Sequence, residues 1–107
     1  MTMLWHSNGG RDYAPLVSRL KDARVEIVFI GGLAAEGGLI VRQMREAGMT
    51  ATAIGGDSLL SDDFWQAAGD AGEGTLVTYP PDPALAPEAA DVVRRFRLKA
   101  LYVTRGA

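Results

Sequence analysis

Residues 25–32 read VEIVFIGG, and this stretch decides the fold. Its first six residues are mostly apolar and rich in β-branched side chains, and a glycine pair ends the run. A short run of this kind is typical of a strand that is buried on both faces of a sheet. The pattern returns at residues 51–54, which end at Gly55-Gly56, and at residues 75–79, which end at a proline pair. These runs predict the strands of one sheet.

Helical patterns separate these strands. Apolar side chains recur at helical spacing over residues 12–23 and 35–47, and a third helix is expected to hold Phe64, Trp65 and Ala68. A last helix is expected over residues 88–98, after the first-turn Pro87, and residues 100–104 are interpreted as either a strand or a disordered tail. The alternation predicts an α/β fold, a three-layer α/β/α sandwich around a parallel sheet. We expect a single lobe over residues 1–107, with its core in residues 12–98 and tails at 1–11 and 99–107.

Residues suited to helix ends support these boundaries. Asp12 is a plausible N-cap of the first helix, Gly48 is a good C-terminal stop of the second, and Ser61 or Asp62 can cap the third. The pair Asp62-Asp63 falls where a helix N-terminus favours negative charge, so we interpret it as capping rather than as an acid–base pair.

The composition is that of a soluble globular domain, with 48% hydrophobic and 22% charged residues. The net charge of −2 and the pI near 5.3 give no electrostatic support for nucleic-acid binding. Cysteine is absent, which excludes disulfides and thiolate chemistry. The apolar runs are far shorter than a membrane span. Residues 1–6 lack the pattern of a secretory signal, so any export signal is expected outside this chain.

The carboxyl ends of parallel strands meet at one edge of the sheet, where ligands bind in folds of this class. Here these ends are followed by residues 31–33, 55–57 and 79–80. The glycine spacing in residues 31–38 matches neither of the common phosphate-binding loops, so we interpret this stretch as a tight strand-to-helix turn. Asp57 has two interpretations: a turn residue or helix cap, or a carboxylate that awaits a cation such as a ligand ammonium group.

No catalytic or metal-binding constellation is visible in the sequence. His6 is the only histidine, and no candidate partner lies near it in the chain. Nothing else combines a nucleophile, a base and an oxyanion stabiliser. The sequence therefore predicts that the protein is not an enzyme and needs no metal or cofactor.

Four stretches resemble one known family. They are residues 12–21 (DYAPLVSRLK), 28–32 (VFIGG), 39–48 (LIVRQMREAG) and 68–77 (AGDAGEGTLV), and they follow the family's order over about two-thirds of the chain. The chain resembles the carboxyl-terminal lobe of type I periplasmic binding proteins of the leucine/isoleucine/valine-binding kind, the receptors that supply ABC importers. After Pro80 the resemblance weakens.

This resemblance implies half of a binding site. The two lobes of such receptors close on a small ligand, and in leucine-type members this lobe contributes an acidic residue to the ligand's ammonium group. That position is Asp57. An aromatic residue usually follows the first glycine pair, but Leu33 stands there, which puts an amino-acid ligand in doubt. Gly32, Gly56 and Ser58 complete the expected ligand-binding set.

The same resemblance implies a ligand class, partners and a location. The expected ligand is a branched-chain or related amino acid or a small carboxylate, the expected partner is an ABC permease, and the expected location is the periplasm. A lone lobe would expose the surface that normally faces its partner, so we also expect a homodimer. A small ligand-sensing or regulatory domain of the same fold is the alternative function.

Overall fold

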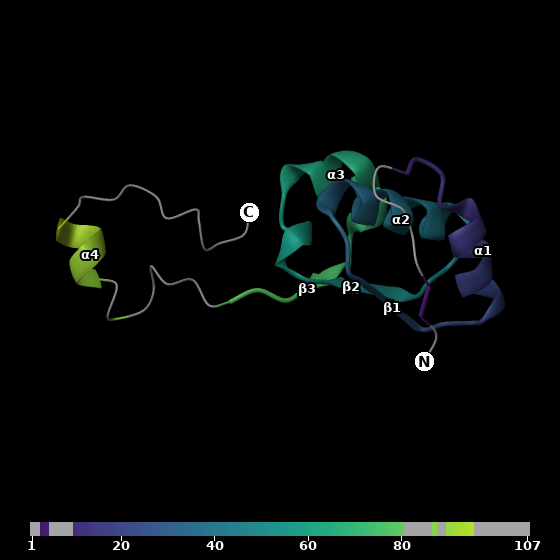
Figure 1. The fold of residues 1–107 in the computed structure, drawn as a ribbon, viewed down its shortest axis with the longest axis horizontal. Coiled ribbons are helices and arrows are strands. Elements are labelled where there is room, and N and C mark those ends of the chain that lie inside the picture. The colour runs from purple at the N-terminus through teal and green to yellow at the C-terminus, as the bar shows by residue number, and fades with distance from the viewer. Residues whose placement is uncertain (1–2, 5–9, 81–86, 88–89, 96–107) are drawn as a thin grey trace.

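The computed structural model describes residues 3–4, 10–80, 87 and 90–95. Helices and strands alternate along the chain, as the sequence predicts (Figure 1). The helices are α1 (Ala14–Asp22), α2 (Ala34–Glu46), α3 (Asp62–Ala68) and α4 (Ala90–Arg95), the strands are β1 (Ile27–Ile30), β2 (Thr52–Gly55) and β3 (Leu76–Val77), and two 3-10 turns are η1 (Asp57–Leu59) and η2 (Gly69–Gly72).

The sheet has three strands in the order β1-β2-β3, and both strand pairs are parallel. Ile27 pairs with Thr52, and Ile54 pairs with Leu76. This confirms the predicted α/β class with a parallel sheet. β3 is shorter than the predicted residues 75–79, because β2 ends at Gly55 and leaves little strand to pair with. The N–H of Thr78 still donates to the carbonyl of Gly55, with 3.0 Å between nitrogen and oxygen.

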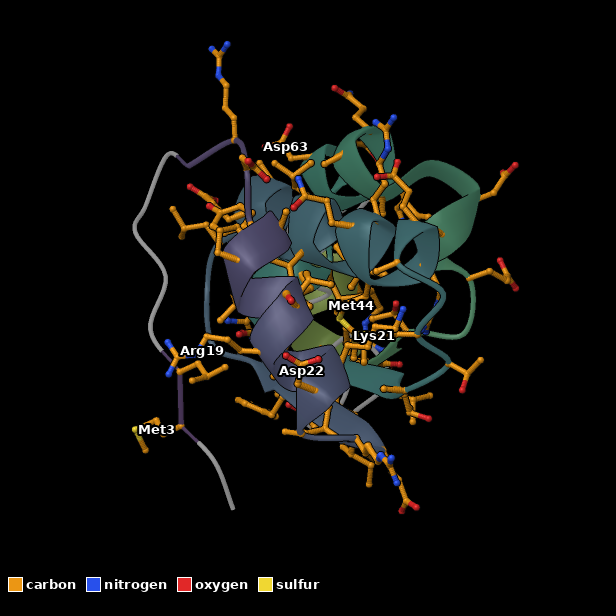
Figure 2. All side chains as sticks on the ribbon, turned by 90° about the vertical axis from the view of Figure 1, so that its right-hand side faces the viewer. Met3, Arg19, Lys21, Asp22, Met44 and Asp63 are labelled. Carbon is orange, nitrogen blue, oxygen red and sulfur yellow. The ribbon has the colours of Figure 1, made fainter. Side chains whose placement is uncertain are left out.

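Helices α1, α2 and α3 lie on one face of the sheet and enclose the core with it (Figure 1). Val28 and Ile30 point into this core, with 9% and 4% of their surface exposed. Met44 of α2 is fully buried and lies behind α1 in Figure 2, whereas Arg19, Lys21 and Asp22 of α1 are exposed.

The other face of the sheet is open among the described residues. Ile27 and Phe29 of β1 are 63% and 66% exposed, and Leu76 of β3 is 55% exposed. The expected burial of the first strand on both faces is therefore not met by the described residues, because α1, α2 and α3 all pack on the same side. Two of the three predicted layers are present, and the third remains a prediction.

The carboxyl-terminal part of the chain is described only in pieces. The helix expected over residues 88–98 is described as α4, residues 90–95, which stands apart from the sheet in Figure 1. The remaining residues of that helix, the tail at 100–104 and His6 lie outside the described residues. The proposed limits of the lobe and its core therefore stay predictions.

The helix ends differ in detail from the predicted caps. Tyr13, not Asp12, is the N-cap residue of α1, and Asp12 accepts the N–H of Ala14 through its Oδ1 at 2.9 Å. Asp12 therefore still accepts a backbone N–H at the start of α1, although it stands one residue before the N-cap, because an aspartate side chain can bond the backbone two positions ahead. Ser61 is the N-cap residue of α3 but makes no capping bond with its side chain. Gly48, with a φ of 79°, follows the end of α2 as predicted.

Candidate functional site

The loops after the three strands lie at one edge of the sheet, because all the strands run in the same direction. Two of these loops are joined directly. The hydroxyl of Ser58, after β2, donates to the backbone carbonyl of Gly32, after β1, with 2.8 Å between the oxygens. The structure thus brings together the loops that carry the five predicted site residues.

Asp57 and Leu33 are both exposed at this edge. Asp57 is the first residue of η1, and its backbone carbonyl accepts the N–H of Leu60 at 3.0 Å. Within the described part of the chain its carboxylate has no hydrogen-bond or ion-pair partner. Leu33 is the N-cap residue of α2 and is 57% exposed. Asp57 therefore occupies a turn, as one interpretation held, while its charge stays available to a cation. Gly32 and Gly56 are half-buried beside them.

Leu59 explains why η1 takes this position. Its side chain is 1% exposed and lies between Gly37 of α2 and Gly55 of β2. A Cβ atom on Gly37 would come within 2.6 Å of Leu59 Cδ2, and a Cβ on Gly55 would come closer still to Cδ1. Both glycines therefore make room for this leucine. The sequence analysis missed this role, although a glycine inside a helix, unfavourable by about 1 kcal/mol relative to alanine, signals close packing.

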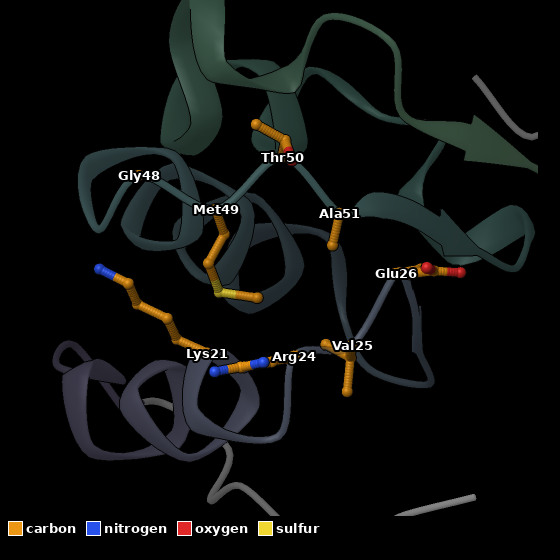
Figure 3. A pocket seen from close by; sticks show the side chains of 8 residues that line it. All are labelled: Lys21, Arg24, Val25, Glu26, Gly48, Met49, Thr50 and Ala51. Atoms are coloured by element: carbon orange, nitrogen blue, oxygen red, sulfur yellow. The ribbon is translucent and has the colours of Figure 1, made fainter.

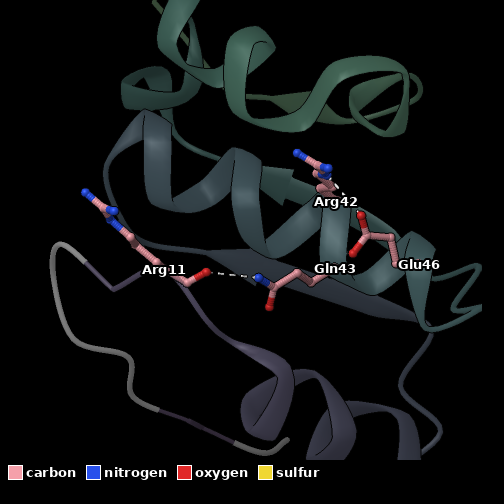
Figure 4. A network of polar contacts seen from close by, with 4 residues as sticks. All are labelled: Arg11, Arg42, Gln43 and Glu46. Atoms are coloured by element: carbon pink, nitrogen blue, oxygen red, sulfur yellow. Dashed lines mark hydrogen bonds and ion pairs between the residues drawn. The ribbon is translucent and has the colours of Figure 1, made fainter.

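A second group of polar contacts ties the start of α1 to α2. The backbone N–H of Tyr13 donates to Oε1 of Gln43 at 2.7 Å. Nε2 of Gln43 donates to the carbonyl of Arg11 at 3.3 Å, which Figure 4 shows. Arg42 and Glu46 form an exposed ion pair on the same helix, with 3.0 Å between Nε and Oε1. The two bonds of Gln43 hold the start of α1 against α2, whereas the ion pair lies within α2 alone.

Burial of the Tyr13 ring raises the pKa of its hydroxyl above the ordinary value of 10.0, and the nearby carboxylate of Glu36 raises it further. A hydrogen bond with the backbone of Gly10 acts in the opposite direction. Tyr13 is 4% exposed and belongs to the core, so this shift reflects packing rather than a reactive site.

A hollow on the described surface lies at the opposite edge of the sheet (Figure 3). It measures about 480 Å³ and is lined by Lys21, Arg24, Val25, Glu26, Gly48, Met49, Thr50 and Ala51. Both of its lining cations lie at helix ends: Lys21 donates to the carbonyl of Ala47, just after α2, at 2.7 Å, and Arg24 follows the C-terminal end of α1. Charges at helix C-termini are stabilising in themselves. We therefore keep the carboxyl edge as the candidate site.

The described residues contain no cluster of three or more metal-ligating side chains. In the same parts of the chain, no helix is long and apolar enough to cross a bilayer.

The sequence profile of the periplasmic binding protein family matches residues 4–102, which is most of the chain. The protein belongs to this family. It is 45% identical over 89 residues to Leu/Ile/Val-binding protein homolog 2 of Brucella abortus, an alignment that covers 83% of this chain and 24% of that protein. It is 36% identical over 102 residues to Leu/Ile/Val-binding protein BraC3 of Rhizobium johnstonii, covering 92% of this chain and 28% of the relative.

Solved structures of periplasmic binding proteins share the fold. The leucine binding protein LivK of Thermotoga maritima superposes with a TM-score of 0.74 and 27% identity, over 88% of this chain and 27% of LivK. The predicted resemblance is therefore confirmed. The chain spans about a quarter of the length of its curated relatives, 24% of one and 28% of another.

Proposed function

We propose that this chain is a non-catalytic solute-binding lobe of a periplasmic receptor, and that its carboxyl edge is half of an amino-acid site. The observation that carries the proposal is the exposed carboxylate of Asp57, which has no partner among the described residues and is presented beside Leu33 by two loops that a hydrogen bond joins. The names of the relatives, Leu/Ile/Val-binding proteins, support a branched-chain amino acid as the ligand.

Charge supports a division of the ligand between two half-sites. Residues 31–36, 55–61 and 78–80, which form or flank this edge, contain no lysine or arginine. An amino acid carries one ammonium and one carboxylate group, and only the ammonium group is complementary to Asp57. The ligand carboxylate therefore requires donors from elsewhere, which a second lobe would supply.

Leu33 is proposed to contact the apolar side chain of the ligand. Its side chain is 57% exposed next to Asp57 along the edge, and it offers neither a ring face nor a hydroxyl group. Contact with an aliphatic side chain is favourable because it removes apolar surface from water. This role suits leucine, isoleucine and valine better than a small carboxylate without an apolar group.

The affinity of the chain by itself is proposed to be weak. An open half-site leaves much of a bound ligand in water, so burial and desolvated hydrogen bonds contribute little. Receptor function, with a periplasmic location and an ABC permease as partner, is proposed for the lobe within a two-lobed receptor, on the strength of the family alone.

A homodimer is proposed for the chain alone. The outward face of the sheet exposes Ile27, Phe29 and Leu76, at 63%, 66% and 55% of their surface. Parallel sheets are ordinarily covered on both faces, so an exposed face of this kind favours association with a second copy.

Titration of the isotope-labelled chain by NMR tests the ligand assignment. Leucine and isopentylamine should shift the amide resonances of Gly32, Gly56 and Asp57, whereas 4-methylpentanoate, which lacks the ammonium group, should not. Asp57→Asn should weaken leucine binding about tenfold or more. Asp22→Asn, an exposed aspartate on α1, is the matched control. Equal affinities of the Asp57 variant and the control would refute the assignment.

A further inference from the structure

Ser58 lies between two residues whose positions the fold determines. Asp57 before it is exposed, and Leu59 after it is buried against Gly37 and Gly55. The backbone of this turn is held by its own hydrogen bonds, from the N–H of Leu59 to Gly56 at 3.1 Å and from that of Leu60 to Asp57 at 3.0 Å. The turn is therefore anchored before any ligand binds.

The hydroxyl of Ser58 connects this anchored turn to a second loop. It donates to the carbonyl of Gly32 at 2.8 Å, although the two residues are 26 positions apart in the chain. A serine hydroxyl can donate one hydrogen bond, and here the carbonyl of Gly32 accepts it. Gly32 directly precedes Leu33, so this bond acts on the backbone that carries the Leu33 side chain.

We propose that Ser58 is a positioning residue, which fixes the loop of Gly32 and Leu33 at a set distance from Asp57. The turn of residues 57–59 is already held by its own backbone bonds, so the hydroxyl of Ser58 restrains the strand-to-helix loop of Gly32 and Leu33. The inference rests on the proposed function, because the distance that it sets is the one between the ammonium contact and the apolar contact of the ligand. Two contacts held in place before binding cost less ordering entropy when the ligand arrives.

The bond also determines what Ser58 presents to a ligand. With its proton donated to Gly32, the oxygen offers only lone pairs to the outside. Beside the carboxylate of Asp57, a second acceptor suits an ammonium group and disfavours a carboxylate. The same bond therefore sets the spacing of the half-site and leaves the side chains of Asp57 and Ser58 as acceptors.

The test uses the full chain and compares Ser58→Ala, Ser58→Thr and the control Ser18→Ala, a serine on the exposed side of α1. In the ligand-free protein, Ser58→Ala should shift the amide resonances of Gly32, Leu33 and Ala34 and speed their hydrogen exchange. Ser58→Thr keeps the hydroxyl and should restore both, and Ser18→Ala should change neither. Leucine affinity should fall about three- to tenfold in Ser58→Ala alone.

The outcomes separate this inference from the proposed function. If Ser58→Ala lowers leucine affinity but leaves residues 32–34 unchanged in the ligand-free protein, Ser58 acts by direct ligand contact alone, it does not position the loop, and the inference is wrong. If the loop changes and the affinity does not, the bond does not position the site, and the inference is again wrong. If the unmodified chain shows no response to leucine or isopentylamine, the proposed function fails, and the ligand-free comparison still decides whether Ser58 holds the loop.

Discussion

The backbone carbonyl of Phe64 lies so close to Gly38 that a Cβ atom there would come within 2.5 Å of its oxygen. This contact brings α3 against α2, and α3 follows directly from the loop that carries Asp57. Because the obstructing atom belongs to the backbone, it cannot rotate away as the end of a side chain could. The close packing of these two helices therefore depends on the missing side chain at position 38.

Gly38→Ala is expected to destabilise the protein by about 1–3 kcal/mol, because overpacking outweighs the better helix propensity of alanine. The free energy of unfolding from urea titrations measures the effect. Gly56→Ala is the control, since nothing lies within 4 Å of a Cβ there, and it should change stability by less than about 0.5 kcal/mol. Equal effects of the two substitutions would contradict the packing argument.

Gln43→Ala is expected to lower the free energy of unfolding by about 1–3 kcal/mol, because it leaves the buried residue Tyr13 with an unsatisfied backbone N–H. Arg42→Ala, on the same helix, removes only an exposed ion pair with Glu46 and should cost less than about 1 kcal/mol. Urea midpoints of the two variants measure the difference. A smaller loss for Gln43→Ala than for Arg42→Ala would exclude the proposed tie between α1 and α2.

The stability of the protein should fall as the pH rises above about 10. Burial raises the pKa of Tyr13 in the folded chain above its unfolded value of 10.0. Between these two values the unfolded state has released its proton while the folded state retains it, so rising pH favours unfolding. The contribution of Tyr13 to stability is fully present below the pKa of its hydroxyl in the unfolded chain, and it is lost as the pH rises through the pKa of the folded chain.

Urea midpoints measured at a series of pH values for the unmodified protein and for Tyr13→Phe isolate this effect. The alkaline loss of stability should be smaller in Tyr13→Phe, because phenylalanine has no proton to release. Tyr79→Phe, an exposed tyrosine, is the control and should leave the slope unchanged. If the urea midpoint fell equally steeply with pH in all three proteins, Tyr13 would not contribute to the alkaline loss of stability.

Phe29→Lys is expected to reduce self-association, since it places a charge at the centre of the open face of the sheet. Sedimentation velocity over a range of protein concentrations measures the dimer fraction. Met3→Lys adds the same charge at another exposed apolar residue, 66% exposed like Phe29, and should leave the dimer intact. A dimer fraction that neither substitution alters would rule out this face as the interface.

Local sequence patterns predicted most of the elements. The β-branched run before Gly31-Gly32 predicted β1, and the apolar stripe with its glycine stop predicted α2 to within one residue at each end. These features depend on side-chain shape and on neighbours a few residues away, which the sequence displays directly. The position of Asp57 was predicted in the same way, because a residue that follows a strand and a glycine pair lies at the carboxyl edge of a parallel sheet.

The sequence by itself determined the α/β class, the direction of the strands and the edge that carries the candidate site. Only the tertiary structure decided that α1, α2 and α3 share one face, that β3 is short, and that Leu59 lies between Gly37 and Gly55. It alone paired Ser58 with Gly32. These features join residues far apart in the chain, and no local pattern records which distant atom fills a given space or accepts a given proton.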